Sequence, residues 1–254
     1  MGDTVRTEVL DGILVITINR PEVRNAINTA AAEGIAAAID ELDARTDLAA
    51  GVITGAGKSF CTGMDLKAFL AGERPSVPER GFAGIVEKPA EKPMIAAVEG
   101  YAVAGGFEIA LACDMIVAAE DAVFGLPEVK RGLVAAGGGL LRLPARAPYQ
   151  LAVEWALTGA FIPAARAAEV FLVNRLTPKG EALQTALEIA LAIAANGPLA
   201  VRATKRILAE SREWPAAEAF DRQRVINEPV RGSADAREGA RAFAEKREPR
   251  WRGA

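Results

Sequence analysis

Two glutamates of this chain lie among small and apolar residues, where a carboxyl group is unusual. Glu108 follows a Gly-Gly pair in the stretch GYAVAGGFEIALACD (residues 100–114), and Glu128 follows a proline in VFGLPEVKRGLVAAGGG (residues 123–139). Carboxyl groups in a low-dielectric environment have raised pKa values and can donate or accept protons near neutral pH. The chain contains no histidine. Triads built on histidine and histidine-ligated metal sites are therefore excluded, and acid–base chemistry must use Asp, Glu, Lys, Tyr or Cys.

Each glutamate also has an ordinary structural interpretation. If a helix begins at Gly105-Gly106, Glu108 falls in its first turn, where negative charge is favourable by ~0.3–1 kcal/mol. Glu128 behind Pro127 is typical of a first helical turn as well. The unpaired N–H groups of a helix start are, however, also suited to stabilise a developing oxyanion. Taken alone, the two stretches leave both interpretations open.

A third stretch, SFCTGMDLKAF (residues 59–69), contains a glycine turn that could present a second backbone N–H, at Met64. The simpler alternative is that Asp65 caps a short helix here. Two N–H donors that converge on one oxygen would form an oxyanion hole.

The elements that must position these residues alternate between short apolar strands and helices, which favours an α/β fold. The Asp11-Gly12 turn predicts a hairpin over residues 5–19, and Asn28 or Thr29 opens a helix over 28–45. Further strands are predicted at 49–54, 94–98 and 114–120, and a helix begins near residue 105. Residues 71–92 read as a surface loop. After residue 145 the pattern is helical, and Gly197-Pro198 separates two of the helices.

Composition narrows the class of protein. The chain has 254 residues, is 51% hydrophobic and carries a formal net charge of -3. It lacks the basic character of a nucleic-acid-binding domain and an apolar run long enough to span a membrane. No secretory signal is visible. Cys61 and Cys113 lie in apolar or glycine-rich surroundings and are predicted to be reduced, buried thiols. A cytoplasmic protein is the expectation.

Taken together and in this order, the three stretches resemble the enoyl-CoA hydratase (crotonase) family. The resemblance covers nearly the whole chain. The segments that carry it are ITINRPEVRNAIN, ITGAGKSFCTGMDLKAF, PMIAAVEGYAVAGGFEIALACDMIVAAEDAVFGLPEVKRGL and REGARAFAEKREPRW. The opening loop and the two ends also resemble the crotonobetainyl-CoA hydratase branch.

The resemblance implies a spiral of ββα units with a helical C-terminal region. It implies a core over residues 1–195 that holds a CoA-thioester site, and a trimerisation region over 196–254. The expected assembly is a homotrimer or a dimer of trimers. The expected substrate is an acyl-CoA thioester, with no cofactor apart from the CoA of the substrate and no metal.

The resemblance also assigns roles. The backbone N–H groups of Met64 and Gly105 would hold the thioester carbonyl. Glu108 would activate water for syn addition to Cβ of a trans-2-enoyl-CoA, and Glu128 would protonate Cα. The expected CoA contacts are Glu22, Val23, Arg24, Ala26, Thr62, Asp65, Leu66, Phe243 and Lys246, the last two often from a neighbouring subunit. For Lys246, an ordinary solvated charge is an equal alternative.

Two other functions stay open. An enoyl-CoA isomerase or another crotonase reaction uses the same fold, although isomerases commonly keep only one carboxylate. A CoA-thioester-binding protein without catalysis would have no need of both glutamates. Ala104, Ala135-Ala136 and the bulky Met64 depart from the common pattern of hydratases, which leaves the acyl chain open.

Overall fold

The computed structural model describes residues 3–254, and its centre is a six-stranded sheet. The strand order is β1-β2-β3-β6-β8-β11. Only the β1–β2 hairpin is antiparallel, and every other neighbouring pair in this sheet is parallel. The strands are β1 (Val5–Leu10), β2 (Ile13–Ile18), β3 (Ala50–Gly55), β6 (Met94–Val98), β8 (Met115–Ala119) and β11 (Arg175–Thr177).

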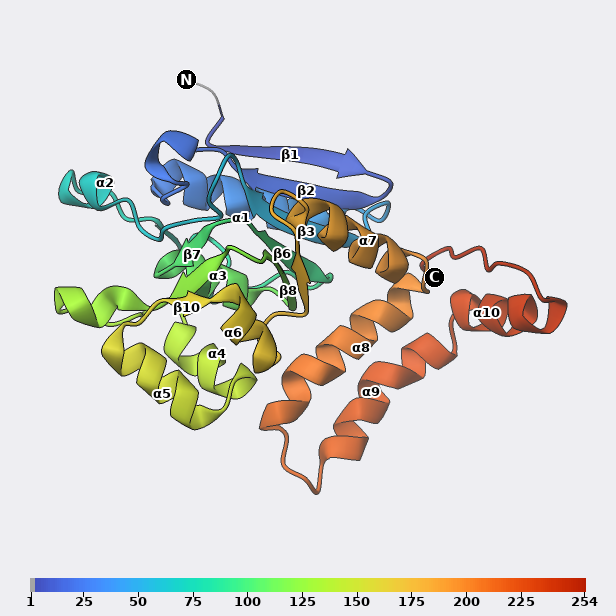
Figure 1. Ribbon diagram of the computed structural model, residues 1–254. Coiled ribbons are helices and arrows are strands. Elements are labelled where there is room, and N and C mark those ends of the chain that lie inside the picture. Colours follow the sequence, from blue (N-terminus) through green and yellow to red (C-terminus); the bar gives the residue numbers. More distant parts are fainter. Residues whose placement is uncertain (1–2) are drawn as a thin grey trace.

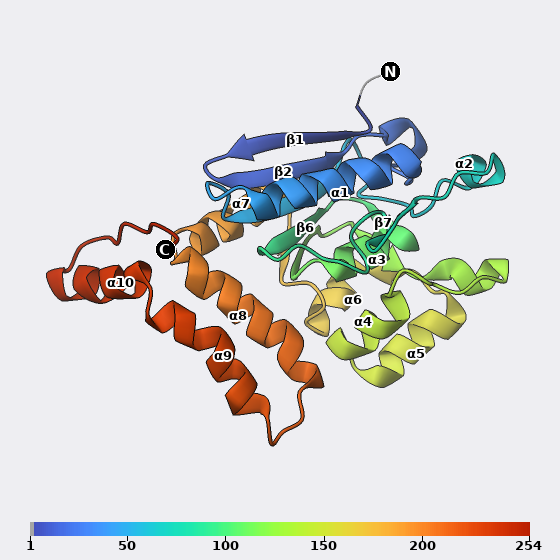
Figure 2. The same cartoon turned by 180° about the vertical axis from the view of Figure 1, so that it is seen from behind.

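Both faces of this sheet are covered by helices, as Figures 1 and 2 show from opposite sides. Helix α1 (Thr29–Ala44), capped by the side chain of Asn28, packs Ile35 and Ile39 against one face. Helix α7 (Ala182–Ala194) presents three buried alanines to the other face. Side chains of a strand alternate between faces, so Ile13 belongs to the α7 side and Leu14 to the α1 side.

A second, three-stranded sheet has the order β10-β9-β7. It contains β7 (Tyr101–Val103), β9 (Val123–Gly125) and β10 (Ile162–Pro163). The chain at Cys61 extends it through an isolated parallel bridge to Ala102. Successive turns of the chain thus give one strand to the large sheet and one to the small sheet, and then a helix. This confirms the predicted spiral of ββα units.

Shorter elements complete the spiral. They are the 3-10 helices η1 (Pro21–Val23) and η2 (Pro127–Arg131), the hairpin β4 (Ser76–Val77) and β5 (Gly81–Phe82), and the helices α2 (Leu66–Leu70), α3 (Gly105–Ala112), α4 (Gly139–Arg146), α5 (Tyr149–Thr158) and α6 (Ala164–Glu169).

The C-terminal part is helical, as predicted, and extends away from the two sheets (Figures 1 and 2). It consists of α8 (Pro198–Glu210), η3 (Ser211–Glu213), α9 (Ala219–Arg231) and α10 (Ala234–Glu245). The tail then returns to α7, where the Trp251 indole N–H donates to the Ala195 carbonyl at 2.8 Å. The boundary at residue 195 stays a prediction, because no observation tests whether either part folds alone.

Residues 71–92 were expected to form a surface loop, and that prediction is wrong for their second half. Ala83 and Ile85 are fully buried in the main core. Arg80 is buried too, pairs with Asp40 of α1 and donates to the Lys88 carbonyl at 3.2 Å. The segment was predicted to be exposed because most of its residues are Gly, Pro or charged, and the few apolar residues that enter the core form no recognisable pattern.

Within residues 3–254 no single helix is long and apolar enough to cross a membrane. Helices α7 and α8 pass a test of length and composition as a bent pair, but α7 packs on the sheet. No group of three Asp, Glu, Cys or His side chains in the same range could hold a metal ion.

Candidate active site

Glu108 lies in the first turn of α3, inside the protein, with only 4% of its surface exposed. Its Oε1 accepts a hydrogen bond from the Gly139 N–H at 2.9 Å. Burial raises the pKa of this carboxyl group, while the N–H groups of Gly139 and Gly137 and the charge of Arg142 act in the opposite direction. The carboxylate is therefore buried yet retains specific partners for its charged form.

Glycines 137–139 form a cradle around this carboxylate. A Cβ atom added to Gly137 would lie 2.5 Å from Oε2 of Glu108, and one added to Gly139 would lie 3.1 Å from Oε1. Real Cβ atoms essentially never show a contact as short as the first, and the second is tighter than nine in ten. Only a backbone without side chains can approach the carboxylate from this direction.

Glu128 lies at the start of η2, behind Pro127. Its Oε2 is buried and has no hydrogen-bond partner among residues 3–254. Burial raises the pKa of Glu128, and the negative charge of Glu108 raises it further. A buried carboxyl oxygen without a partner is costly, by ~1–3 kcal/mol, and requires a specific explanation.

Burial raises the pKa of both carboxyl groups, but the groups that surround them differ. Glu108 has donors that favour its anion, whereas Glu128 has an unpaired oxygen and a negative neighbour. The two pKa values are thus raised for partly different reasons, and such differences in surroundings can separate the roles of two carboxyl groups. Both first-turn positions expected from the sequence are present, so the capping interpretation holds as local structure but does not explain the unpaired oxygen.

The segments that carry the two expected oxyanion donors meet at the edge of the second sheet. Cys61 forms a parallel bridge with Ala102, and Met64 forms one with Ile27. A Cβ added to Gly63 would lie 3.0 Å from the Gly105 nitrogen, so the two backbones are in contact. Gly105 begins α3, and its N–H has no partner within that helix.

Ala104, which precedes Gly105, has a strained backbone with φ 51° and ψ -131°. L-residues other than glycine rarely adopt this conformation, and it costs of the order of 1–3 kcal/mol. Strain of this kind persists where the surrounding structure imposes it, often at active sites. Here it turns the chain so that the Gly105 N–H begins α3 next to Gly63.

Two loops that carry expected CoA contacts meet beside this site. The Ile27 N–H donates to the Gly63 carbonyl at 2.8 Å, and the Asp65 N–H donates to the Ile27 carbonyl at 2.9 Å. Thr62 Oγ1 donates to the Arg24 carbonyl at 3.4 Å. Of the expected contacts, Thr62 and Arg24 therefore touch directly, and Asp65 is joined to the loop of Ala26 through Ile27.

Asp65 has structural partners as well. It caps α2 by accepting from the N–H groups of Lys67 and Ala68, and it pairs with Arg20 at 2.9 Å. The capping expected as the simpler alternative is therefore present. The charge of Arg20 and these N–H groups lower the pKa of Asp65 despite its burial.

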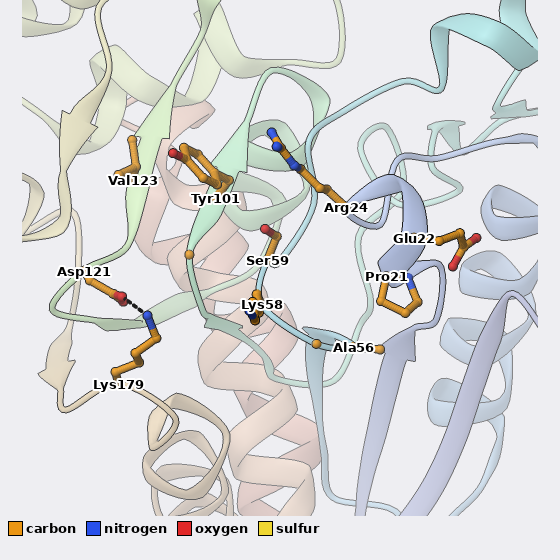
Figure 3. Close-up of a pocket in the computed structure, with 12 residues that line it drawn as sticks. Pro21, Glu22, Arg24, Ala56, Lys58, Ser59, Tyr101, Asp121, Val123 and Lys179 are labelled. Atoms are coloured by element: carbon orange, nitrogen blue, oxygen red, sulfur yellow. Dashed lines mark hydrogen bonds and ion pairs between the residues drawn. The ribbon is translucent and has the colours of Figure 1, made fainter.

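An open cleft of about 750 Å³ lies next to the first of these loops (Figure 3). Arg24 lies 6.0 Å from the centre of the Tyr101 ring, and Lys179 pairs with Asp121 at 2.5 Å. Glu108 and Glu128 do not line this cleft. Its lining consists of Pro21, Glu22, Arg24, Ala56, Gly57, Lys58, Ser59, Gly100, Tyr101, Asp121, Val123 and Lys179.

Comparison with known proteins shows to which family this chain is related. Residues 8–254 match the model of the enoyl-CoA hydratase/isomerase family. The chain belongs to the enoyl-CoA hydratase/isomerase family. An enoyl-CoA hydratase of Mycobacterium tuberculosis is 44% identical over 94% of this chain and 92% of its own. A carnitinyl-CoA dehydratase of Salmonella typhimurium is 42% identical over 95% of each chain. The crystal structure of an enoyl-CoA hydratase from Mycobacterium marinum superposes with a TM-score of 0.98, at 56% identity and full coverage of both chains.

Two residues expected to contact CoA in this family lie apart from the rest. Phe243 and Lys246 belong to α10 and its C-terminal cap, on the part that extends away from the sheets (Figure 1). The residue Phe243 is 88% exposed. Within one chain of this family member, α10 therefore does not join the loops around Asp65.

Several residues that build the site were missed by sequence reasoning. The glycine run 137–139 follows Glu128 in the sequence, but Gly137 and Gly139 lie against Glu108. Asn25 is fully buried, and its side chain fixes the loop by donating to the Ala56 and Ser59 carbonyls. Phe82 packs its ring on Gly105. A buried asparagine or a distant phenylalanine leaves no local pattern that could have revealed these contacts.

Proposed function

We propose that this protein is an enoyl-CoA hydratase, which adds water reversibly to a trans-2-enoyl-CoA to give a 3-hydroxyacyl-CoA. The observation that carries the proposal is the pair of carboxyl groups, one that accepts the Gly139 N–H and one with a buried, unpaired oxygen, together with the contact of Gly63 and Gly105 at the start of α3. Relatives named as hydratases or dehydratases, with 42–56% identity, support the same reaction.

In the proposed mechanism, the N–H groups of Met64 and Gly105 hold the thioester oxygen. Negative charge grows on that oxygen as water adds to Cβ, and one such donor typically contributes ~2.7–4 kcal/mol. Glu108, as the anion, accepts a proton from the attacking water. Glu128, as the acid, gives its proton to Cα. The reverse dehydration uses the same groups in opposite roles, and the chemistry needs no cofactor beyond the CoA of the substrate.

The acid and base assignment follows from their surroundings. Two backbone N–H groups and Arg142 favour the charged form of Glu108. The charge of Glu108 and the unpaired Oε2 favour the neutral form of Glu128. Protonation of either group changes the other, so a pH–rate profile reports the pair rather than single residues.

We propose that the CoA part of the substrate binds to two loops. The residues expected to contact it are Glu22, Val23, Arg24, Ala26, Thr62, Asp65 and Leu66. Phe243 and Lys246 would reach the site from another copy of the chain, in a homotrimer or a dimer of trimers. The exposed Phe243 and the distance of α10 from these loops support this arrangement. Light scattering measures the assembly, and Lys246→Ala should raise KM for the substrate more than Lys88→Ala does. The two free, buried cysteines support a reducing, cytoplasmic location.

The test is the loss of enoyl-thioester ultraviolet absorbance with crotonyl-CoA. Glu108→Gln and Glu128→Gln should each lower kcat at least ~100-fold, as expected for acid–base groups. Glu120→Gln, at an exposed glutamate next to β8, serves as the control. A panel of branched and betaine-like enoyl-CoA substrates defines the acyl group.

A double-bond migration assay runs in parallel. Turnover of a 3-enoyl-CoA without hydration of any 2-enoyl-CoA would replace the hydratase by an isomerase. Tight binding of acyl-CoA without turnover in either assay would replace both by a non-catalytic binding protein.

A further inference from the structure

One half-buried cation lies near the Glu108 carboxylate. Arg142 belongs to α4, one turn after the helix start at Gly139 whose N–H binds Glu108. Its guanidinium lies against Gly138, the middle glycine of the cradle, and its Nη2 donates to the Val86 carbonyl at 2.6 Å. Among residues 3–254 it forms no ion pair at contact distance with any carboxylate.

The same contact reaches the segment that packs on the oxyanion site. Val86 is buried in the stretch that follows β5, and Phe82 of β5 places its ring on Gly105. Arg142 thus joins the cradle of Glu108 to the segment that covers one of the two expected oxyanion donors.

We infer that Arg142 is a positioning residue that holds the glycine cradle against Glu108 and favours the ionised form of that carboxylate. This inference rests on the proposed function, since it concerns the base of the same reaction. Arg142 does not touch the reacting atoms. It acts through residues 137–139 and through its charge.

The charges around Glu108 make the inference specific. From α4 it faces Arg142, and from η2 it faces Glu128, whose pKa the charge of Glu108 raises. Arg131 acts on Glu128 only, and the Cys113 thiol near Arg142 stays neutral, because burial raises its pKa to about 12. Arg142 is thus the one cation among the described residues that favours the Glu108 anion.

Helix α4 offers a matched control. Arg146 lies one turn further along and is also half-buried. Its Nη2 donates to a backbone carbonyl, that of Cys113, at 2.7 Å. It does not act on the pKa of Glu108. Arg146→Gln therefore removes a comparable buried cation and hydrogen bond without changing the field at the base.

The experiment compares Arg142→Gln, Arg142→Lys and Arg146→Gln across pH. Losing the positive charge should raise the pKa of Glu108, so the acid limb of the kcat profile in Arg142→Gln should move to higher pH. Its kcat near neutral pH should fall about tenfold, with KM within about threefold, as for coupled neighbours in one network. Arg142→Lys should restore the acid limb, and Arg146→Gln should leave limb and kcat unchanged.

A second readout does not depend on turnover. The ¹³C carboxyl shift of Glu108, assigned with Glu108→Gln, should titrate at higher pH in Arg142→Gln than in wild type. If wild type lacks hydratase activity, the proposed function fails while this titration still tests the coupling. An unchanged titration in Arg142→Gln, or an equal shift in Arg146→Gln, would overturn the inference.

Discussion

The glycine cradle makes a quantitative prediction for Gly137→Ala. The new Cβ would lie 2.5 Å from Glu108 Oε2, whereas ordinary contacts begin at 3.4 Å. One of the two groups must move by the difference, about 0.9 Å. The backbone of Gly137 has no positive φ, so alanine adds no conformational strain of its own. The end of the Glu108 side chain is the more mobile partner and should give way.

A displacement of this size separates activity from stability. A misplacement of ~1 Å at a reacting group can cost ~100-fold in rate. We therefore expect kcat to fall about 100-fold in Gly137→Ala, while the free energy of unfolding changes by about 1 kcal/mol or less because the side chain moves. Steady-state kinetics and urea denaturation measure the two quantities.

The control is Gly232→Ala, at a glycine with φ -80° whose added Cβ would have its nearest neighbours at 3.8 Å. Activity and stability should both stay close to wild type. If Gly137→Ala keeps kcat within about threefold of wild type, the cradle does not set the position of Glu108. If Gly137→Ala unfolds the protein instead, moving the Glu108 side chain does not relieve the clash, and the surrounding backbone is disturbed as well.

Three further predictions concern stability. Ala104→Gly should stabilise the fold by about 1 kcal/mol, because relief of a strained positive φ exceeds the entropy that glycine adds to the unfolded chain; a lower midpoint in urea would contradict the strain. Glu128→Gln should stabilise the protein by about 1 kcal/mol at pH 7, because the wild-type group is ionised and solvated in the unfolded chain and loses that solvation on folding. Since the folded-state pKa of Glu128 is raised above its ordinary 4.5, this gain should be complete above the raised pKa and vanish as pH falls below 4.5, and a gain independent of pH would refute the assignment. Asp65→Ala removes a helix cap and leaves the 15% exposed Arg20 without its partner, so it should cost about 2–3 kcal/mol in thermal or chemical unfolding. Glu41→Ala, in an exposed pair with Arg45, should cost less than ~1 kcal/mol. Equal losses in the two variants would show that the cap and the buried pair of Asp65 add no more stability than an exposed ion pair.

Local patterns predicted the elements that carry the chemistry. The hairpin at Asp11-Gly12, the helix capped by Asn28 and the buried strand at 94–98 are all confirmed. Each is specified by nearby residues, through turn chemistry, a cap or an apolar run. The two- and three-residue strands β7, β9 and β10 were missed, because their pairing partners lie far away in sequence.

The residues of the candidate site also fall into those that the sequence predicted and those that depend on distant contacts. Glu108 and Glu128 were found because a carboxyl group among apolar residues is visible in the sequence itself. Arg142 was not, since its meaning depends on contacts with Val86 and Gly138 that only the folded chain creates. Residues 71–92 show the limit most clearly: a glycine-rich, charged segment places Phe82 on Gly105 by anchoring Arg80 and Ile85 in the interior.

These contacts explain why the site needs so many glycines. The buried Glu108 carboxylate is approached by the N–H groups of Gly137 and Gly139, while Gly105, the proposed oxyanion donor, is approached by Gly63 and covered by Phe82. A Cβ at any of these positions would occupy space that a backbone or side-chain atom already fills. The small residues therefore bring rigid backbone dipoles close to charges that appear only during the reaction, and such dipoles need no rearrangement when those charges form.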